Sequence, residues 1–213
     1  MADRITKAEQ YERTRRALLD AARELFAEQG YANTSTEEIV SRARSKVTRG
    51  AVYYHFRDKA GLFEAVYNEE QQNFLQFIAG RVQDADAERD LWQRLVVTTC
   101  YAFVERAADP HTQRILHIDG PAVLGRTAAT RTGPGLKLAR QMFEALVSVG
   151  LLKPLSLDPL ISLLWALFFE AGVYIANAAD TATAQKDMLA TMLEILDGLR
   201  VEPRADMTEE AGI

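Results

Sequence analysis

Apolar residues recur with the period of an α-helix along almost the whole of this 213-residue chain. No segment alternates apolar and polar residues in the way that a half-buried strand does. Short connections rich in glycine, proline and small polar residues separate the periodic segments. The sequence therefore predicts an all-α fold, with helices over about residues 7–29, 36–43, 48–56, 59–80, 86–107, 109–119, 134–149, 158–179 and 181–200.

Glycine, serine and aspartate mark where the first helices begin and end. Gly30 follows the first helix and is a typical C-terminal stop. Ser35 and Glu38 have the spacing of a capping box, and Asp58 can cap the fourth helix. Because the fourth helix starts beside a basic segment and continues into the rest of the chain, we expect it to link two domains. These are an N-terminal domain over residues 1–60, a second helical domain over 61–201 and a disordered tail over 202–213.

Positive charge is concentrated near the N-terminus of a chain whose net charge is -5. Residues 42–59 contain six Lys and Arg against the single acid Asp58. Residues 1–60 as a whole hold 12 Lys and Arg against 9 Asp and Glu, whereas the remainder holds 13 against 21. Attraction to a polyanion is therefore expected at the N-terminal end of the molecule.

The helix predicted over residues 48–56 carries polar and aromatic side chains that a protein core does not accommodate together. Val52 and Phe56 are spaced to face inward, and Thr48 can cap the helix. The side chains left facing outward are those of Arg49, Tyr53, Tyr54 and His55. Their polar groups can donate hydrogen bonds to phosphates and base edges. Two short helices joined by a tight turn, the second of them basic, are typical of a helix-turn-helix, so we expect double-stranded DNA as a partner.

The residues 37–40, E-E-I-V, and 47–59, V-T-R-G-A-V-Y-Y-H-F-R-D-K, resemble the DNA-binding domain of tetracycline-repressor-like (TetR) transcriptional regulators. The pairs Gly30-Tyr31 and Thr34-Ser35 fall where that family has its own signatures. The resemblance covers about residues 8–65. It implies a helix-turn-helix domain followed by a helical domain that binds an effector and forms the dimer.

The resemblance also implies roles for residues at matching positions. Ser35 is similar to a phosphate contact, and Arg49 and Gly50 are similar to positions that approach base edges. The remaining positions that the resemblance places against DNA are Thr48, Tyr53, Tyr54, His55 and Lys59. The chain departs from the family in the turn between the two short helices, where A-R-S-K-V replaces the usual A-G-V-T and lacks its glycine. We expect Arg44 and Lys46 in this longer turn to contribute further DNA contacts.

The last two predicted helices contain more apolar surface than one buried side requires, which indicates burial all round. A second copy of the chain is the cover we expect, giving a two-fold four-helix bundle, although a central position in one monomer is the alternative. The residues predicted to form this interface are Leu160, Leu164, Leu167, Ala171, Leu189, Met192 and Leu196.

The helices of the second half also supply aromatic residues with a few polar groups, a mixture that suits a largely apolar cavity for a small effector. The candidate ligand-binding residues are Phe77, Trp92, Cys100, Phe103, His117, Met142, Phe143, Trp165, Phe169 and Tyr174. Most of these are expected to belong to the core, with a minority touching the ligand.

The chain lacks the sequence motifs that several other functions require. The chain contains no phosphate-binding loop, zinc-protease motif, paired-cysteine site or nucleophile turn, so we expect no enzyme activity, no cofactor and no metal site. Its single cysteine, Cys100, suits a reducing compartment, and the apolar run from Leu160 is broken by Glu170, so we expect a cytoplasmic protein without a membrane span. The sequence predicts a homodimeric repressor released from a near-palindromic operator by a small apolar ligand. An activator or a protein-responsive regulator of the same fold, and a helical lipid-binding protein or enzyme, are the alternatives.

Overall fold

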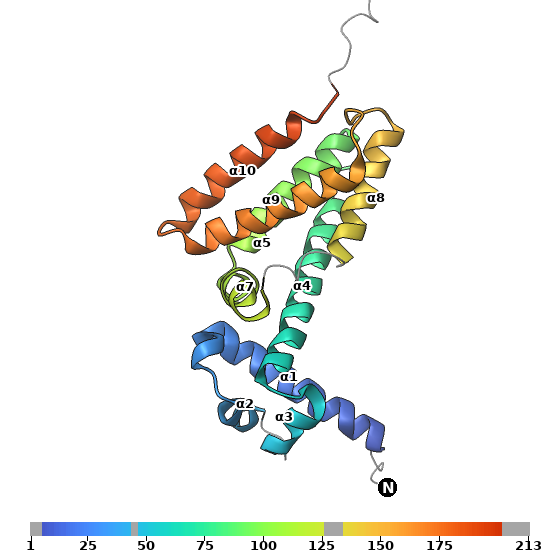
Figure 1. Cartoon of the computed structure of the whole chain (residues 1–213). Helices are drawn as coiled ribbons and strands as arrows, with labels where there is room; N and C mark the ends of the chain where they lie inside the picture. Colours follow the sequence, from blue (N-terminus) through green and yellow to red (C-terminus); the bar gives the residue numbers. More distant parts are fainter. Residues whose placement is uncertain (1–5, 44–46, 126–133, 202–213) are drawn as a thin grey trace, which may run out of the picture.

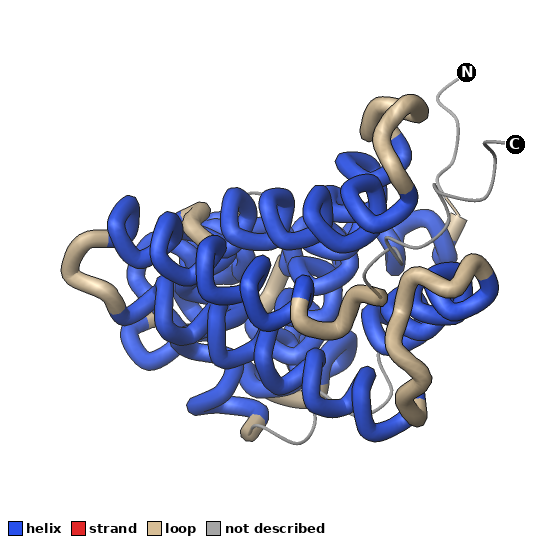
Figure 2. The backbone as a smooth tube through the Cα atoms, turned by 90° about the horizontal axis from the view of Figure 1, so that it is seen from above, coloured by secondary structure: helices blue, strands red, loops and turns tan. Residues whose placement is uncertain are grey.

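The computed structural model describes residues 6–43, 47–125 and 134–201, and within these ranges the chain is helical apart from its connections (Figure 2). The only strand-like pairing in the described ranges is an isolated antiparallel bridge between Leu152 and Arg200, so the predicted all-α fold is confirmed. The elements are α1 (Lys7–Asn33), α2 (Thr36–Arg42), α3 (Arg49–Phe56), α4 (Lys59–Gln83), η1 (Gln93–Val97), α5 (Thr98–Ala107), α6 (Pro110–Thr112), η2 (Gln113–Asp119), α7 (Gly120–Leu124), α8 (Pro134–Ser148), α9 (Leu157–Asn177) and α10 (Thr181–Asp197).

Helices α1 to α3 and the start of α4 lie together at one end of the molecule (Figure 1), and their buried residues belong to the core cluster that continues into the second half. The regular part of α1 ends at Gly30, whose backbone has φ of 82° and ψ of 164°. The predicted capping box of Ser35 and Glu38 starts α2, and the Asp58 carboxylate accepts from the Gly61 amide at 2.7 Å to start α4. The cap expected from Thr48 is wrong, because its side chain makes no capping hydrogen bond at the start of α3.

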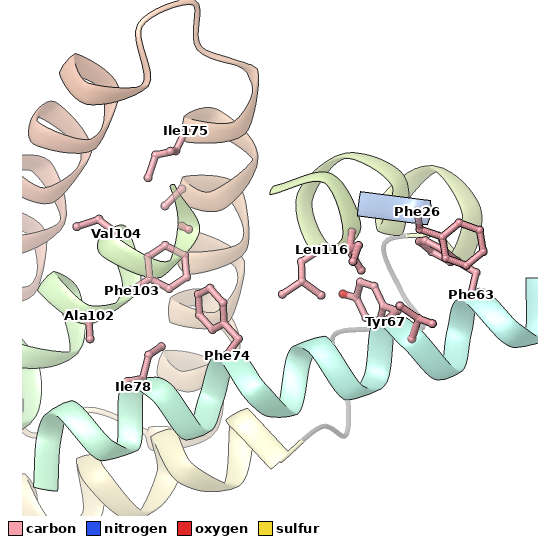
Figure 3. Close-up of a cluster of buried hydrophobic side chains, with 14 of the residues drawn as sticks. Phe26, Phe63, Tyr67, Phe74, Ile78, Ala102, Phe103, Val104, Leu116 and Ile175 are labelled. Atoms are coloured by element: carbon pink, nitrogen blue, oxygen red, sulfur yellow. The ribbon is translucent and has the colours of Figure 1, made fainter. Parts of the chain in front are cut away.

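Helix α4 connects this N-terminal unit to the rest of the molecule, and one buried cluster follows it along its length (Figures 1 and 3). Near its start Phe63 stacks edge-on against Phe26 of α1, with ring centroids 5.2 Å apart. Further along, Phe74 makes the same kind of contact with Phe103 of α5 at 5.4 Å. A movement of α4 would therefore be felt by the packing of both units.

Two segments of the second half are wound as π-helices, which the sequence did not predict. η1 interrupts the helix expected over residues 86–107, and that helix begins only after Asp90, whose carboxylate accepts from the Gln93 amide at 2.9 Å. η2 occupies most of the helix expected over 109–119. A π turn adds a residue to the local winding and redirects the side chains that follow, and such turns are frequent at functional sites.

Helix α9 packs against α5, α8, α10 and η2, and α10 covers α5 and α9 (Figure 1). α9 is long and apolar enough to span a membrane by length and composition alone, yet it is a packed element of the helical domain. Only 28% of its apolar window is buried inside one protomer. A large apolar face of α9 is therefore left uncovered by the chain itself.

Candidate nucleic-acid interface and internal cavity

Helix α3 presents an exposed polar and aromatic face beside α2. Val52 and Phe56 are buried beneath it, as the apolar spacing predicts. Thr48, Arg49, Gly50 and Tyr53 are exposed, and Tyr54 is the most open of the set, with 76% of its surface accessible. This exposed face is wide enough to offer a guanidinium and two phenols to one ligand.

The Arg49 guanidinium is held by an ion pair with the Glu37 carboxylate of α2, at 2.8 Å. Both side chains are more than half exposed. Exposed ion pairs contribute at most about 1 kcal/mol, so a phosphate or a guanine edge can replace Glu37 as the partner. The pair keeps Arg49 at the junction of α2 and α3 while the surface is free.

His55 does not share the exposed face, which corrects the expectation that it points outward. Its ring lies against Tyr11 of α1, with centroids 4.3 Å apart, and next to Tyr54 at 5.2 Å. Its Nδ1 is buried without a hydrogen-bond partner among the described residues, and burial lowers the pKa of the imidazole. His55 therefore braces α3 against α1, and its predicted DNA contact stays a prediction.

Lys59 is likewise engaged inside the domain. Its ammonium donates to the carbonyls of Tyr31 and Thr34, both at 2.9 Å, and lies 4.0 Å from the centre of the Tyr31 ring. These hydrogen bonds fix the start of α4 to the end of α1 and to the residue that follows it. The predicted DNA contact of Lys59 stays a prediction.

Ser35 stands at the start of α2 with its hydroxyl bound to the Glu38 carboxylate at 2.8 Å. Its predicted phosphate contact stays a prediction. The turn residues Arg44 and Lys46, also predicted to contact DNA, lie outside the described residues.

A cavity of about 490 Å³ lies between α4, α5, α8, α9 and the two π-helical segments. Its size suits a small molecule, and its walls are overwhelmingly apolar. The lining residues are Tyr67, Gln71, Phe74, Leu75, Ile78, Ala79, Val82, Gln83, Arg94, Leu95, Thr99, Phe103, Leu116, His117, Gly135, Leu138, Ala139, Gln141, Met142, Phe143, Ala145, Leu164, Trp165, Phe168 and Phe169.

The predicted ligand-binding residues divide between this cavity and other surroundings. Those that line it are Phe103, His117, Met142, Phe143, Trp165 and Phe169. Phe77 and Trp92 instead pack beneath Arg81 and Arg200, and Tyr174 lies on the exposed face of α9. Cys100 is fully buried, and burial raises the pKa of its thiol to about 12, so it is a core residue and not a reactive thiolate.

Some residues that line the cavity carry buried polar atoms without hydrogen-bond partners among the described residues, which sequence reasoning mostly missed. Both ring nitrogens of His117, Nε1 of Trp165 and Nε of Arg94 are buried and make no hydrogen bond within the described ranges. Arg94 and His117 belong to η1 and η2, so both π-helical segments contribute residues to the cavity lining. No periodicity rule could have identified Arg94, because a π turn shifts the face on which a residue lies.

His117 makes the stability of the fold depend on acid pH. Burial lowers the pKa of its imidazole from 6.5 to about 4, so between these values the unfolded chain binds a proton that the folded chain does not. Stability from this residue is therefore present above pH 6.5 and falls as the pH drops towards 4, by up to about 3 kcal/mol. Urea unfolding of the wild type and His117→Leu at several pH values should show a steeper acid loss for the wild type. Parallel curves would contradict it.

The residues predicted to form a dimer interface differ in their burial within one protomer. Leu160, Leu164, Ala171, Met192 and Leu196 are buried and face the chain's own helices. Leu167 and Leu189 are partly buried and pack against the same core. The predicted interface stays a prediction. The exposed apolar residues of α9 and α10 are Leu163, Tyr174 and Ile195.

Two family models match the chain in the order in which the two units occur. Residues 18–66 match the model described as "Bacterial regulatory proteins, tetR family", and residues 92–199, half of the chain, match "Tetracyclin repressor-like, C-terminal domain". The chain belongs to the TetR family. It is thus a transcriptional regulator with a helix-turn-helix DNA-binding domain, and not an enzyme.

The TetR-family regulator is similar to known proteins over its full length. The crystal structure of a TetR-family transcriptional regulator from Pectobacterium atrosepticum is 32% identical, with a TM-score of 0.75, covering 93% of this chain and 100% of that chain. The HTH-type transcriptional regulator SrpR of Pseudomonas putida is 28% identical over 217 residues, 97% of this chain and 94% of SrpR. The HTH-type transcriptional repressor BepR of Brucella suis is 46% identical over 63 residues, 30% of this chain and 29% of BepR, so this chain spans less than a third of that relative.

Proposed function

We propose that this TetR-family regulator is a homodimeric repressor that a small, largely apolar ligand releases from a near-palindromic operator. The observation that carries the proposal is the connection of the exposed α3 face, through α4, to a domain with an apolar cavity of about 490 Å³. A repressor that acts on chromosomal DNA works in the cytoplasm. BepR, which is similar to this chain over its DNA-binding region, is named a transcriptional repressor, and this supports repression over activation.

Base reading is assigned to Arg49, with Tyr53 and Tyr54 contributing contacts to the DNA backbone. Arginine commonly donates two hydrogen bonds to guanine in the major groove. In a two-fold dimer, two α3 helices would enter successive major grooves about 34 Å apart. His55 and Lys59 would hold α3 in position from behind, because both contact the N-terminal unit itself.

The second copy of the chain would cover the uncovered faces of α9 and α10. Leu163 is 70% exposed, and Tyr174 and Ile195 are about half exposed. These side chains lie on two helices that pack against each other. Two copies of this helix pair related by a two-fold axis would give a four-helix bundle, in which a residue that contacts a second residue of the partner copy is itself contacted in the same way.

The segment η2 connects the cavity directly to α1. Leu116 and His117 line the cavity. Two residues further along, the Asp119 carboxylate accepts from the Tyr31 amide at 2.7 Å, at the end of α1. Arg114, earlier in η2, donates to the Gln29 carbonyl at 3.3 Å. A ligand that favours one position of η2 and α4 over another would therefore change the spacing of the α3 helices and lower DNA affinity.

Arg49→Ala should reduce binding to the DNA upstream of the protein's own gene by about 1–3 kcal/mol and weaken the preference for that sequence. The measurement is fluorescence anisotropy with the specific fragment and a random fragment of equal length. Arg140→Ala is the matched control, because Arg140 is also exposed and paired with an acid, Asp158, but lies on α8. An equal loss on both fragments for Arg49→Ala would contradict base reading.

A further inference from the structure

Glu37 is an acidic side chain on the helix-turn-helix surface formed by α2 and α3. It lies in the first turn of α2 and is exposed, and its Oε1 is 2.8 Å from Nη1 of Arg49 on α3. Every phosphate of double-stranded DNA carries a negative charge, and like charges brought together are unfavourable. A carboxylate at this place therefore lowers the affinity for DNA in general, unless it makes a contact that compensates.

The cap and the core of α2 are formed without Glu37. The next residue, Glu38, closes the capping box, with its carboxylate accepting from the amide of Ser35 at 2.7 Å and from the Ser35 hydroxyl at 2.8 Å. Ile39 is the buried residue of the helix. An acid near a helix N-terminus is favourable, but Glu38 already supplies one there. The carboxylate of Glu37 is therefore available for a role at the surface.

Two neighbours hold the Glu37 carboxylate in one orientation. Oε1 faces the Arg49 guanidinium, and Oε2 accepts from the Thr36 hydroxyl at 3.0 Å. Hydrogen bonds from its own backbone amide and from the Thr36 hydroxyl lower the pKa of the carboxyl group. Glu37 is therefore ionised at neutral pH, and it places a hydrogen-bond acceptor directly beside the donors of Arg49.

A donor beside an acceptor is complementary to the edge of a G·C base pair in the major groove. Guanine presents the acceptors N7 and O6 there, and cytosine presents its N4 amino group as a donor. Arginine commonly donates to guanine, and glutamate accepts from the cytosine amino group. A sequence that offers a guanine beside a cytosine can therefore engage Arg49 and Glu37 together, without leaving either charge unpaired.

We propose that Glu37 is a specificity-determining residue that reads a cytosine beside the guanine read by Arg49. On DNA without this arrangement Glu37 stays paired with Arg49 and keeps the guanidinium from adding a phosphate contact. Specificity often comes from such a penalty on the wrong partner as well as from contacts to the right one. The inference rests on the proposed function, in which Arg49 reads a base.

The first test measures binding to a random-sequence duplex by fluorescence anisotropy over a range of salt concentrations. Glu37→Gln keeps the size of the side chain and removes its charge. It should bind random DNA about threefold to fivefold more tightly than the wild type, because an exposed ion pair no longer competes for Arg49. The plot of log affinity against log salt concentration should become steeper by about 0.9, the value for one added phosphate contact. Glu37→Asp, which keeps the charge, should retain the wild-type slope.

Glu105→Gln is the matched control for the change in charge. Glu105 is also about half exposed and paired with an arginine, Arg81, but it lies on α5 in the second domain (Figure 1). It should leave the affinity and the slope on random DNA unchanged. A protein with both Arg49→Ala and Glu37→Gln should have the slope of Arg49→Ala alone, because the guanidinium that Glu37→Gln releases is then missing.

The second test selects binding sites from a pool of random-sequence duplexes. The wild type should select a cytosine next to a guanine whose selection depends on Arg49. Glu37→Gln should replace that cytosine by adenine, because a glutamine side chain pairs with N6 and N7 of adenine. Glu105→Gln should select the same sites as the wild type.

Two results would overturn the proposal in a Glu37→Gln protein whose circular dichroism shows it to be folded. One is selection of the same sites as the wild type, and the other is unchanged affinity and slope on random DNA. If Arg49→Ala still lost the sequence preference in either case, the role of Glu37 would fall and base reading by Arg49 would stand. An equal loss on specific and random DNA for Arg49→Ala would instead contradict the proposed function.

Discussion

Leu163→Asp should leave the protein monomeric and weaken its binding to a two-half-site operator by about 10²–10⁴-fold, the usual gain from linking two binding modules. Leu163 is 70% exposed in the protomer, so the substitution does not disturb the core of a single chain. In the proposed bundle the new carboxylate would be buried against apolar side chains of the second copy, and burial of an unpaired charge is strongly unfavourable. Sedimentation velocity and fluorescence anisotropy would measure the two effects.

Val147→Asp is the matched control for this experiment. Val147 is also an apolar residue with about half of its surface exposed, but it lies on α8, outside the proposed bundle. It should leave both the dimer and the DNA affinity unchanged. A dimeric Leu163→Asp protein, or equal losses for the two variants, would contradict an interface on α9 and α10.

The dimer face illustrates what helical periodicity can and cannot predict. The excess of apolar surface on the last two helices is visible in the sequence and is matched by the uncovered face of α9. Periodicity does not say which of two apolar stripes meets the chain's own core. Leu164 and Met192 are buried by neighbouring helices, whereas Leu163, one position along, is open. That choice depends on the packing of α9 against other helices, among them α5, which is distant from it in sequence.

The candidate DNA-binding surface likewise has features that helical periodicity predicted and features that it could not predict. The spacing of apolar residues correctly predicted that Val52 and Phe56 are buried and that Tyr53 and Tyr54 are exposed. It failed for His55, because the residue that covers its ring, Tyr11, is on another helix and cannot be seen from the spacing within α3. The spacing also gives no sign that Lys59 binds two carbonyls, since its partners, Tyr31 at the end of α1 and Thr34, are distant from it in sequence.

The cavity could be predicted as a kind of site but not as a set of residues. Aromatic content alone could not distinguish the aromatic residues that line the cavity from those that do not. Phe103 and Trp165 line it, whereas Trp92 and Tyr174 do not. Burial alone does not distinguish a residue in the cavity wall from a residue in the packed core, because both kinds of residue are buried and apolar. The π-helical segments that contribute Arg94 and His117 to the lining depend on local winding that a 3.6-residue pattern does not register.

Gly61→Ala should destabilise the N-terminal unit by about 1–3 kcal/mol, the usual cost of overpacking a fixed site. A Cβ at this position, in the first turn of α4, would lie 2.1 Å from the carbonyl oxygen of Phe56 and 3.3 Å from its carbonyl carbon. These are backbone atoms at the end of α3, so no side chain can move aside. Relief requires a shift of α3 relative to α4, and the connection through Arg57, with φ of 69°, has little freedom to provide it.

Gly80→Ala, in the same helix, separates this clash from the effect of helix propensity. Among the described residues, no atom outside the nearby turns of the same helix lies within 4 Å of a Cβ at Gly80, so the added methyl group should stabilise α4 by about 0.5–1 kcal/mol. Urea unfolding followed by circular dichroism would rank the three proteins, with Gly80→Ala above and Gly61→Ala below the wild type. Because α3 must move to admit a methyl group at Gly61, DNA binding by Gly61→Ala should fall even at temperatures where the chain remains folded. If the two alanine variants proved equally stable and bound DNA alike, the close approach of α3 and α4 would not control the DNA-binding surface.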